Sequence, residues 1–194
     1  KDQNNNWVSP DEITSIDGKK FLLIDKTQEI KVGPSESMSK SKKNTIDPEK
    51  IIENYGADSV RLFMLSDSPP EKDVQWSDQG MIACYKFIQK LWTLHEKIKV
   101  KLEEKDESET HSEEMLRFTN QLIDKININL EKFNYNVIIA NIYETYNFFN
   151  QKVNGPLNSK ILFENYKKIL SILLPILPHF ASECFEDLKI TDKA

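Results

Sequence analysis

Helical periodicity over the second half of the chain is the feature that most constrains its fold. Ser77 is a natural N-cap, and the apolar positions that follow it recur every three or four residues. They define one buried face, made of Met81, Cys84, Tyr85, Ile88, Leu91, Trp92, His95 and Ile98. Similar patterns cover residues 116–130, 137–153, 158–174 and 183–188. We therefore predict an antiparallel helical bundle over residues 77–194.

A short β-containing segment is expected over residues 1–34. Residues 21–24 form an apolar run and residues 29–32 alternate between polar and apolar side chains. Both patterns are typical of strands, and Gly33-Pro34 closes the second one. The fold class predicted for the whole chain is mainly α, with a small α+β segment before the bundle.

Residues 35–76 connect these two parts. They begin with a polar loop rich in serine and lysine, residues 35–46. Two short helices follow. Asp47 is the expected N-cap of the first, and Asp58 is the expected N-cap of the second.

Composition excludes several classes of protein. The chain is 39% hydrophobic and has no apolar run of about 18 residues, so we predict no membrane span and no membrane partner. The N-terminus lacks a secretory signal pattern, and two cysteines suit a reducing compartment, which together favour the cytoplasm. The net charge of −5 argues against bulk capture of nucleic acid, so any such contact needs a local patch.

The chemistry of the chain is expected in the run from Ser37 to Asn44, Ser-Met-Ser-Lys-Ser-Lys-Lys-Asn. Lysines in such a loop are mobile point charges that can close over a polyphosphate, while serine hydroxyls and loop amides donate hydrogen bonds. A solvated basic loop without a ligand is the other interpretation of this composition.

The stretch MSKSKKNTIDPEKIIENYGADSVRLFMLSDSPPEKDVQWSDQG, residues 38–80, resembles the segment that carries the K-M-S-K-S signature of class I aminoacyl-tRNA synthetases. Asp47-Pro48 and the run from Tyr55 to Arg61 match the large aliphatic members of that class. Lys42-Lys43-Asn44 is similar to the leucine-specific members, as are NWVSP near the N-terminus and LLPILPHFASECFEDL near the C-terminus. The chain is identified as a member of the leucyl-tRNA synthetase family.

This resemblance implies ATP-dependent activation of leucine, with Mg2+, followed by transfer of leucine to tRNA(Leu). Lys40 aligns with the second lysine of the signature and is the implied catalytic residue, stabilising the departing pyrophosphate. The implied ATP-binding residues are Met38, Ser39, Lys40 and Ser41. Ser37 stands where the signature has its first lysine, which leaves a two-lysine clamp in question.

The chain begins at Lys1 rather than at a methionine, so we expect an upstream part. In the family that part holds the nucleotide-binding catalytic domain, and the fragment alone is therefore expected to be inactive. A free-standing, non-catalytic tRNA-binding or scaffold module derived from a synthetase is the alternative. The resemblance assigns no tRNA-contacting residue, and we predict no metal site.

Further candidates each have two interpretations. Arg61 can contact phosphate or form a buried ion pair, and His95 is expected to be a packed core residue. His179 and Cys184 share a predicted helix but lack the further ligands of a zinc site. Five lysines can track a tRNA backbone or form a solvated face: Lys125, Lys132, Lys152, Lys167 and Lys168. Five aromatic residues are expected to lie in the core rather than stack on bases: Tyr135, Tyr143, Tyr146, Phe148 and Phe149.

Overall fold

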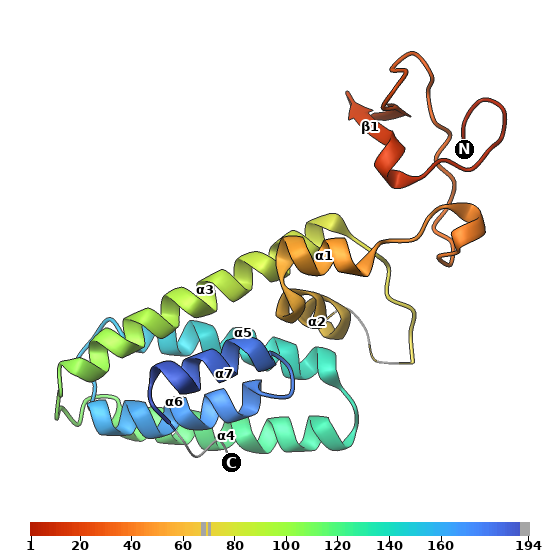
Figure 1. The fold of residues 1–194 in the computed structure, drawn as a ribbon. Helices are drawn as coiled ribbons and strands as arrows, with labels where there is room; N and C mark the ends of the chain where they lie inside the picture. The colour runs from red at the N-terminus through yellow and green to blue at the C-terminus, as the bar shows by residue number, and fades with distance from the viewer. Residues whose placement is uncertain (67–68, 70, 191–194) are drawn as a thin grey trace. The chain divides into compact units, whose positions relative to one another are not determined.

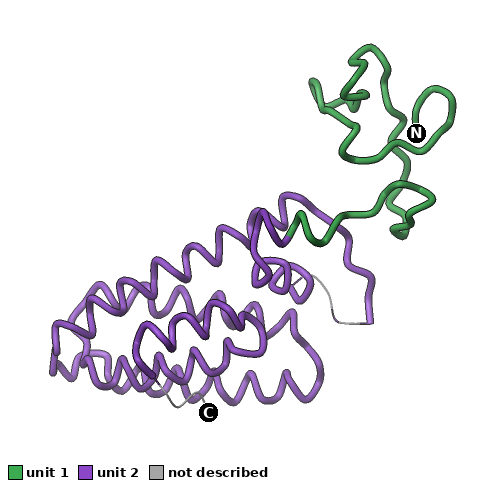
Figure 2. Tube along the Cα trace, in the orientation of Figure 1, with its two compact units in different colours: residues 1–51 green, residues 52–194 purple. Residues whose placement is uncertain are grey.

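The computed structural model describes residues 1–66, 69 and 71–190, and most of the described chain is helical (Figure 1). The chain divides into two compact units, residues 1–51 and residues 52–194 (Figure 2). The predicted fold class, mainly α with a small β component, is confirmed. In the described part of the chain, no helix combines the length and the apolar character needed to cross a membrane.

The first unit contains a two-stranded antiparallel hairpin, β1 (Ile13–Ile16) and β2 (Lys19–Leu22). Asp17 and Gly18 form its two-residue turn, with φ angles of 47° and 80°. Positive φ at both positions is the type I′ geometry that matches the twist of paired strands.

The strand prediction in this unit was therefore partly wrong. β2 ends at Leu22 rather than at residue 24, and residues 29–32 contribute only an isolated bridge between Glu29 and Phe21. Asp17-Gly18 closes a tight hairpin, so residues 13–16, which carry less apolar character, become the partner of β2.

The first unit continues with two short 3-10 turns and the start of a helix. The turn η1 (Pro10–Glu12) precedes the hairpin, and the turn η2 (Lys40–Lys42) lies in the polar loop. Helix α1 (Pro48–Tyr55) begins as predicted, with Asp47 accepting a hydrogen bond from the Glu49 N–H at 3.1 Å.

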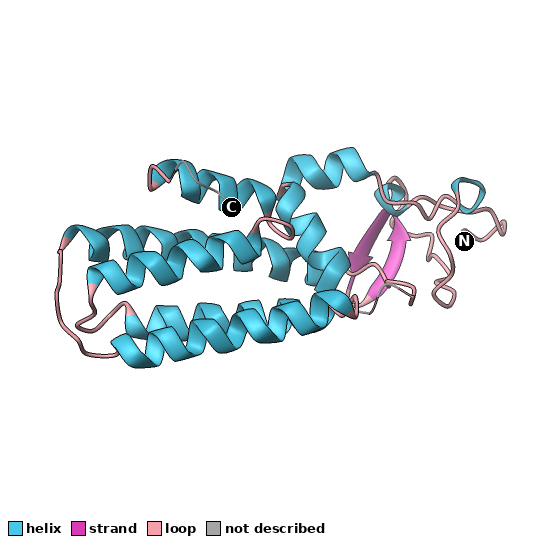
Figure 3. Cartoon of the chain, turned by 90° about the horizontal axis from the view of Figure 1, so that it is seen from below, coloured by secondary structure: helices cyan, strands magenta, loops and turns pink. Residues whose placement is uncertain are grey.

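The second unit is a helical bundle, seen from below in Figure 3. Its helices are α2 (Ala57–Ser66), α3 (Asp78–Glu103), α4 (Ser112–Glu131), α5 (Tyr135–Lys152), α6 (Ser159–Leu173) and α7 (Pro178–Asp187). Ser77 caps α3 by accepting from the Gly80 N–H at 3.1 Å. Pro178 begins α7, as proline can at the first helical position, so this helix starts five residues before the predicted residue 183.

The bundle holds nearly all of the buried apolar side chains. Its largest fully buried residues come from α2 to α7 and from the connections between them, and include Leu62, Met81, Ile98, Met115, Ile138, Phe149, Leu170 and Phe185. Burial of apolar surface on this scale is the main stabilising contribution to such a domain.

The side chain of Asp58 joins α2 to the first turn of α7. The Asp58 carboxylate, which was expected to cap its own helix, lies inside α2 and accepts from the N–H groups of His179 and Phe180 at 3.3 and 2.7 Å. These groups lie in the first turn of α7, where helical donors have no partner of their own. The capping prediction for Asp58 was therefore wrong, because its partners lie about 120 residues away in sequence.

Candidate functional site

The signature loop, residues 35–46, is ordered by a short backbone turn. Ser39 has an extended backbone, and the turn η2 follows it directly. The Lys42 N–H donates to the Ser39 carbonyl, and the Lys43 N–H donates to the Lys40 carbonyl, both at 3.1 Å. Lys43 ends the turn in the left-handed region, with φ of 51°. Lys40 is thus the first residue of a defined turn rather than part of an extended strand.

The side chain of Asn44 fastens the two ends of this turn. Its Oδ1 accepts from the Ser39 N–H at 2.7 Å, and its Nδ2 donates to the Ser37 carbonyl at 3.3 Å. An amide can bridge a backbone donor and a backbone acceptor in this way because it carries both functions. Sequence reasoning used Asn44 only to recognise the motif and missed its structural role.

The two serines that flank Lys40 contact each other. Ser39 Oγ and Ser41 Oγ lie 2.7 Å apart, so one donates a hydrogen bond to the other. One hydroxyl uses its hydrogen in this contact, and the other keeps an O–H that can donate to an anion. Met38, the fourth predicted ATP-binding residue, is 48% exposed.

The lysines of the loop differ in their partners. Lys42 pairs with Glu36, and the hydrogen bond from this ammonium lowers the pKa of the Glu36 carboxyl below its usual value. Lys40 and Lys43 are exposed and make no ion pair with any residue that the structure describes. Lys40 is therefore the lysine of η2 that is available to an incoming ligand.

This donor set fits a polyphosphate. Two free ammonium groups, two adjacent hydroxyls and exposed loop amides are the groups that bind phosphate oxygens. Glu36 is the one carboxylate paired within the loop, and Lys42 neutralises it. The Lys42 ammonium is thus held at the carboxylate of Glu36, the residue that precedes position 37, where the sequence lacks the expected lysine.

Arg61 makes no ion pair with a carboxylate among the described residues. Its Nε donates to the Ile176 carbonyl at 3.0 Å, and its Nη2 donates to the Pro175 carbonyl at 2.6 Å. Together with Asp58, it joins α2 to the turn between α6 and α7. The buried ion pair expected for Arg61 was therefore wrong, because its partners are backbone carbonyls, and the phosphate contact stays a prediction.

The five lysines considered as one stripe do not share a free face. Lys152 is buried, and its ammonium contacts Glu114 at 2.5 Å and the Phe148 ring at 5.6 Å. Lys125 pairs with Glu144 at 3.8 Å. Lys152 stabilises the α4–α5 contact and is not positioned to bind a partner.

The aromatic series lies mainly within the packing of the bundle. Phe149 is buried, Phe148 stacks on Phe118 with ring centroids 4.0 Å apart, and Tyr143 packs on Phe87 at 3.9 Å. Such pairs stabilise a core beyond the area that they bury. The core interpretation is confirmed for Phe149 and fits the half-buried Phe148, whereas Tyr143 packs on Phe87 but remains exposed.

His95 is fully buried in a polar cluster. Its Nδ1 lies 3.0 Å from the Tyr166 hydroxyl, and its Nε2 lies 3.0 Å from the Asp187 carboxylate. The Lys99 ammonium contacts the same carboxylate at 2.6 Å. Glu96 completes a group of possible metal ligands with His95 and Asp187. The Lys99 ammonium, however, already neutralises the Asp187 carboxylate. His95 is the packed core residue that the periodicity predicts.

His179 and Cys184 do not form a metal site. The Nδ1 of His179 contacts Asp58 at 2.9 Å, whereas Cys184 is buried 4.0 Å from the Tyr166 hydroxyl. Burial raises the pKa of the Cys184 thiol to about 12, as is typical of a buried structural cysteine.

Two known protein families match separate parts of the chain. Residues 30–77 match a family described as tRNA synthetases class I (I, L, M and V). Residues 112–194 match a family described as the anticodon-binding domain of tRNA ligase. The first match contains the signature loop, and the second contains α4 to α7.

Individual relatives are leucine–tRNA ligases. The chain is 35% identical to that of Mesorhizobium japonicum over 97% of its own length, and 38% identical to that of Bartonella quintana over 92%. It spans only 23% and 22% of the lengths of these two relatives.

A solved structure shares the fold. It is the ternary complex LeuRS-tRNA-LeuAMS, with agnB2 LeuRS of Agrobacterium radiobacter K84. The TM-score is 0.72 at 24% identity, and the match covers 80% of this chain and 21% of that one. The motif, the two family matches and these relatives agree, and the chain belongs to the leucyl-tRNA synthetase family of class I aminoacyl-tRNA synthetases.

Proposed function

We propose that this chain is the signature-loop and tRNA-binding part of a leucine–tRNA ligase. The full-length ligase activates leucine with ATP and Mg2+ and transfers it to tRNA(Leu). The observation that carries the proposal is the free ammonium of Lys40 on an ordered turn, in a chain whose relatives are leucine–tRNA ligases. The upstream nucleotide-binding catalytic domain of the same protein supplies the leucine pocket.

We divide the chain into three parts according to the function proposed for each. Residues 1–34 are a short β-containing segment, residues 35–76 hold the signature loop and the connecting helices, and residues 77–194 are the tRNA-binding domain. We propose a cytoplasmic location for the ligase, where its substrates tRNA(Leu), leucine and ATP meet.

The chemistry assigned to Lys40 is electrostatic. When the leucine carboxylate attacks the α-phosphorus of ATP, negative charge grows on the departing pyrophosphate. A positioned ammonium stabilises this charge more strongly in the transition state than in the ground state, and so it accelerates the step. Met38, Ser39 and Ser41 hold the loop on the phosphates through backbone and hydroxyl donors. Bound Mg2+ neutralises further phosphate charge, and we assign it no ligand in this chain.

Lys42 offers a substitute for the missing first lysine of the signature. Lys42 pairs with Glu36, the residue that precedes Ser37, so the loop keeps a second lysine close in sequence to the position of the missing one. Because Glu36 cancels part of the Lys42 charge, we expect the substitute to be weaker than an unpaired lysine.

A non-catalytic module that binds tRNA is the second candidate, and Ser37 is the observation that favours it. Both candidates bind tRNA, but only the ligase catalyses exchange between ATP and pyrophosphate in the presence of leucine. This exchange therefore separates the two.

The test is Lys40→Ala in the full-length ligase. We expect leucine-dependent ATP–pyrophosphate exchange to slow by two or more orders of magnitude, because one preorganised donor is worth about 3–4 kcal/mol. Lys43→Ala is the comparison, since Lys43 is the other exposed lysine of the loop but lies outside the position that aligns with the signature. Its exchange rate should stay within about tenfold of wild type. A Lys40→Ala rate within a few-fold of wild type would remove Lys40 from the mechanism. An inactive wild-type ligase would favour the non-catalytic module.

A further inference from the structure

Three lysines share the outer side of α3. Lys86 and Lys90 are separated by one helical turn, and Lys97 follows two turns later, so all three lie within one strip of the surface. All three are exposed. The carboxylates of α3 belong to Asp78, Glu96 and Glu103, which lie about a quarter of a turn away around the helix axis.

Two contacts show which helix borders this strip. Lys97 Nζ donates to Asn150 Oδ1 of α5 at 3.0 Å, and the Phe87 ring packs on Tyr143 of α5 at 3.9 Å. Residue numbers increase together along these two contacts, so α3 and α5 run in the same direction, as Figure 1 shows. Asn147 is exposed and lies one turn after Tyr143, between the two contacts.

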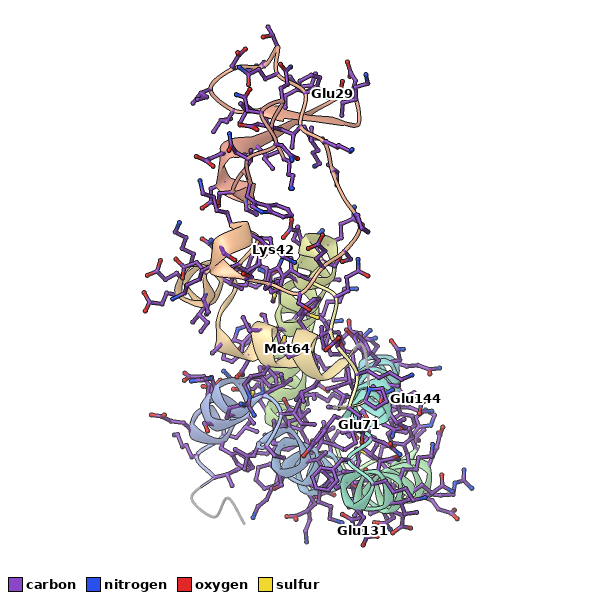
Figure 4. The ribbon with its side chains drawn as sticks, turned by 90° about the vertical axis from the view of Figure 1, so that its right-hand side faces the viewer. Glu29, Lys42, Met64, Glu71, Glu131 and Glu144 are labelled. Carbon is purple, nitrogen blue, oxygen red and sulfur yellow. The ribbon has the colours of Figure 1, made fainter. Side chains whose placement is uncertain are left out.

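The facing side of α5 adds no negative charge. Helix α5, which the structure describes completely, contains one carboxylate, that of Glu144. Glu144, which is labelled in Figure 4, pairs with Lys125 of α4 and lies about 100° around the helix axis from Tyr143. We define the α3–α5 face as Lys86, Lys90, Lys97, Tyr143, Asn147 and Asn150.

This face has the charge that RNA requires, in a chain whose net charge is −5. Three lysines spread over 11 residues of helix span about 16 Å, which is the length of several backbone phosphates. Asparagine amides and a tyrosine hydroxyl donate hydrogen bonds to phosphate and sugar oxygens. The Tyr143 ring packs on Phe87 and is 36% exposed, so the face lacks a free aromatic platform for unstacked bases.

We propose that the α3–α5 face binds the sugar–phosphate backbone of tRNA. The proposal rests on the proposed function and specifies which surface of the bundle makes the contact. Recognition at this face is electrostatic and independent of base sequence, because lysine–phosphate contacts position a nucleic acid without reading it. Four other lysines of the bundle lie in ion pairs: Lys99, Lys101, Lys125 and Lys152.

The test uses two triple variants of the full-length ligase with the same change in charge. The first replaces Lys86, Lys90 and Lys97 by glutamine. The control replaces Lys125, Lys132 and Lys168, three exposed lysines outside the α3–α5 face, by glutamine. The dissociation constant for tRNA(Leu) is measured over a series of salt concentrations.

We expect the first variant to lose about two to three units of the slope of log K against log salt, since each lost phosphate contact removes about 0.7–0.9. At low salt its affinity should fall by tenfold or more. The control should keep the wild-type slope and an affinity within about threefold. An unchanged slope in the first variant, or an equal loss in the control, would overturn the proposal.

Two further readouts keep the result interpretable. Leucine-dependent ATP–pyrophosphate exchange should be unchanged in the first variant, which shows that the ligase is folded. If the triple variant does not fold, Lys90→Gln alone should still lower the slope by about 0.7–0.9. A wild-type ligase that neither binds tRNA(Leu) nor charges it would refute the proposed function, whereas binding with a slope that ignores these lysines refutes only the proposed face.

Discussion

Each of the two units of this chain is stabilised internally by a different kind of interaction. In residues 1–51, Ile30 is the one buried apolar side chain, and the structure consists of a hairpin, short turns and polar contacts such as those of Asn44. In the bundle, buried apolar residues come from α2 to α7 and include Phe149 and Phe185. The bundle is therefore stabilised by packing, and the signature loop by a few exposed hydrogen bonds.

This difference suits two different tasks. A packed core has a single arrangement, so the bundle can present a fixed surface to a large partner. Exposed hydrogen bonds contribute little net stability, so the loop can rearrange around a ligand at a small cost in free energy. The following predictions test the contrast between the two units, beginning with the largest expected effect.

Truncating a core side chain should give the largest difference in stability between the two units. Phe149→Ala removes a ring that is 2% exposed, and we expect the free energy of unfolding to fall by about 3–5 kcal/mol. Ile24→Ala is the control in the first unit, where the side chain is 92% exposed, and its effect should stay within about 0.5 kcal/mol. Urea unfolding followed by circular dichroism measures both. Similar losses for the two variants would contradict the contrast.

Two glycines provide a matched test of close packing. A Cβ at Gly80 would lie 2.8 Å from Phe63 Cε2, whereas a Cβ at Gly33 would meet no atom within 4 Å. Overpacking costs about 1–3 kcal/mol, and alanine returns about 1 kcal/mol of helix propensity. We expect Gly80→Ala to destabilise the bundle by about 1 kcal/mol and Gly33→Ala to have little effect.

The partner of this clash can be tested directly. Phe63→Leu makes room for a methyl group, so the double variant Phe63→Leu/Gly80→Ala should lose less stability than the sum of the single changes. Strict additivity in thermal unfolding would show that Phe63 does not cause the strain.

Acid should weaken the bundle through His95. Burial lowers the pKa of His95 below 6.5, although its hydrogen bond to Asp187 opposes the shift. The unfolded chain therefore takes up a proton at a higher pH than the folded chain. Stability should fall as the pH drops below about 6.5, by at most about 1.4 kcal/mol per pH unit, and should level off below the folded pKa.

The control is His95→Gln, which cannot titrate. Its stability should be lower at pH 7, but the part of the pH dependence due to residue 95 should be absent. The first unit contains no histidine, so no such change is expected there. If wild type and His95→Gln show the same slope between pH 5 and 7, His95 does not carry the effect.

What could be predicted from the sequence depended on how local the determining interactions are. The long helices were predictable because three- and four-residue spacing is a property of a single segment, and Ser77 caps α3 from the adjacent position. The signature loop was predictable because a contiguous motif identifies it, and the catalytic role of Lys40 stays a prediction. The β1 strand was missed although Asp17-Gly18 is a strong hairpin signal, because the apolar run after it drew the strand boundary toward residue 24.

The remaining features depend on partners that are distant in sequence. Asp58 caps α7 and Arg61 holds the α6–α7 turn, both across more than 100 residues. Lys152 pairs with Glu114 of another helix, so it does not belong to an exposed row of lysines that could bind tRNA. The α3–α5 face was equally hidden, because Lys86, Lys90 and Lys97 become one surface with Asn150 only when α5 packs beside α3.

The central claim is that the two units bind different substrates, and hydrogen exchange in the full-length ligase tests it most directly. We expect ATP with Mg2+ to slow amide exchange at residues 38–43 and to leave α3 and α5 unchanged. We expect tRNA(Leu) to slow exchange in α3 and α5 around Lys90 and Asn147. If ATP leaves residues 38–43 unchanged, or if tRNA protects the bundle without protecting α3 and α5, the assignment of the two units is contradicted.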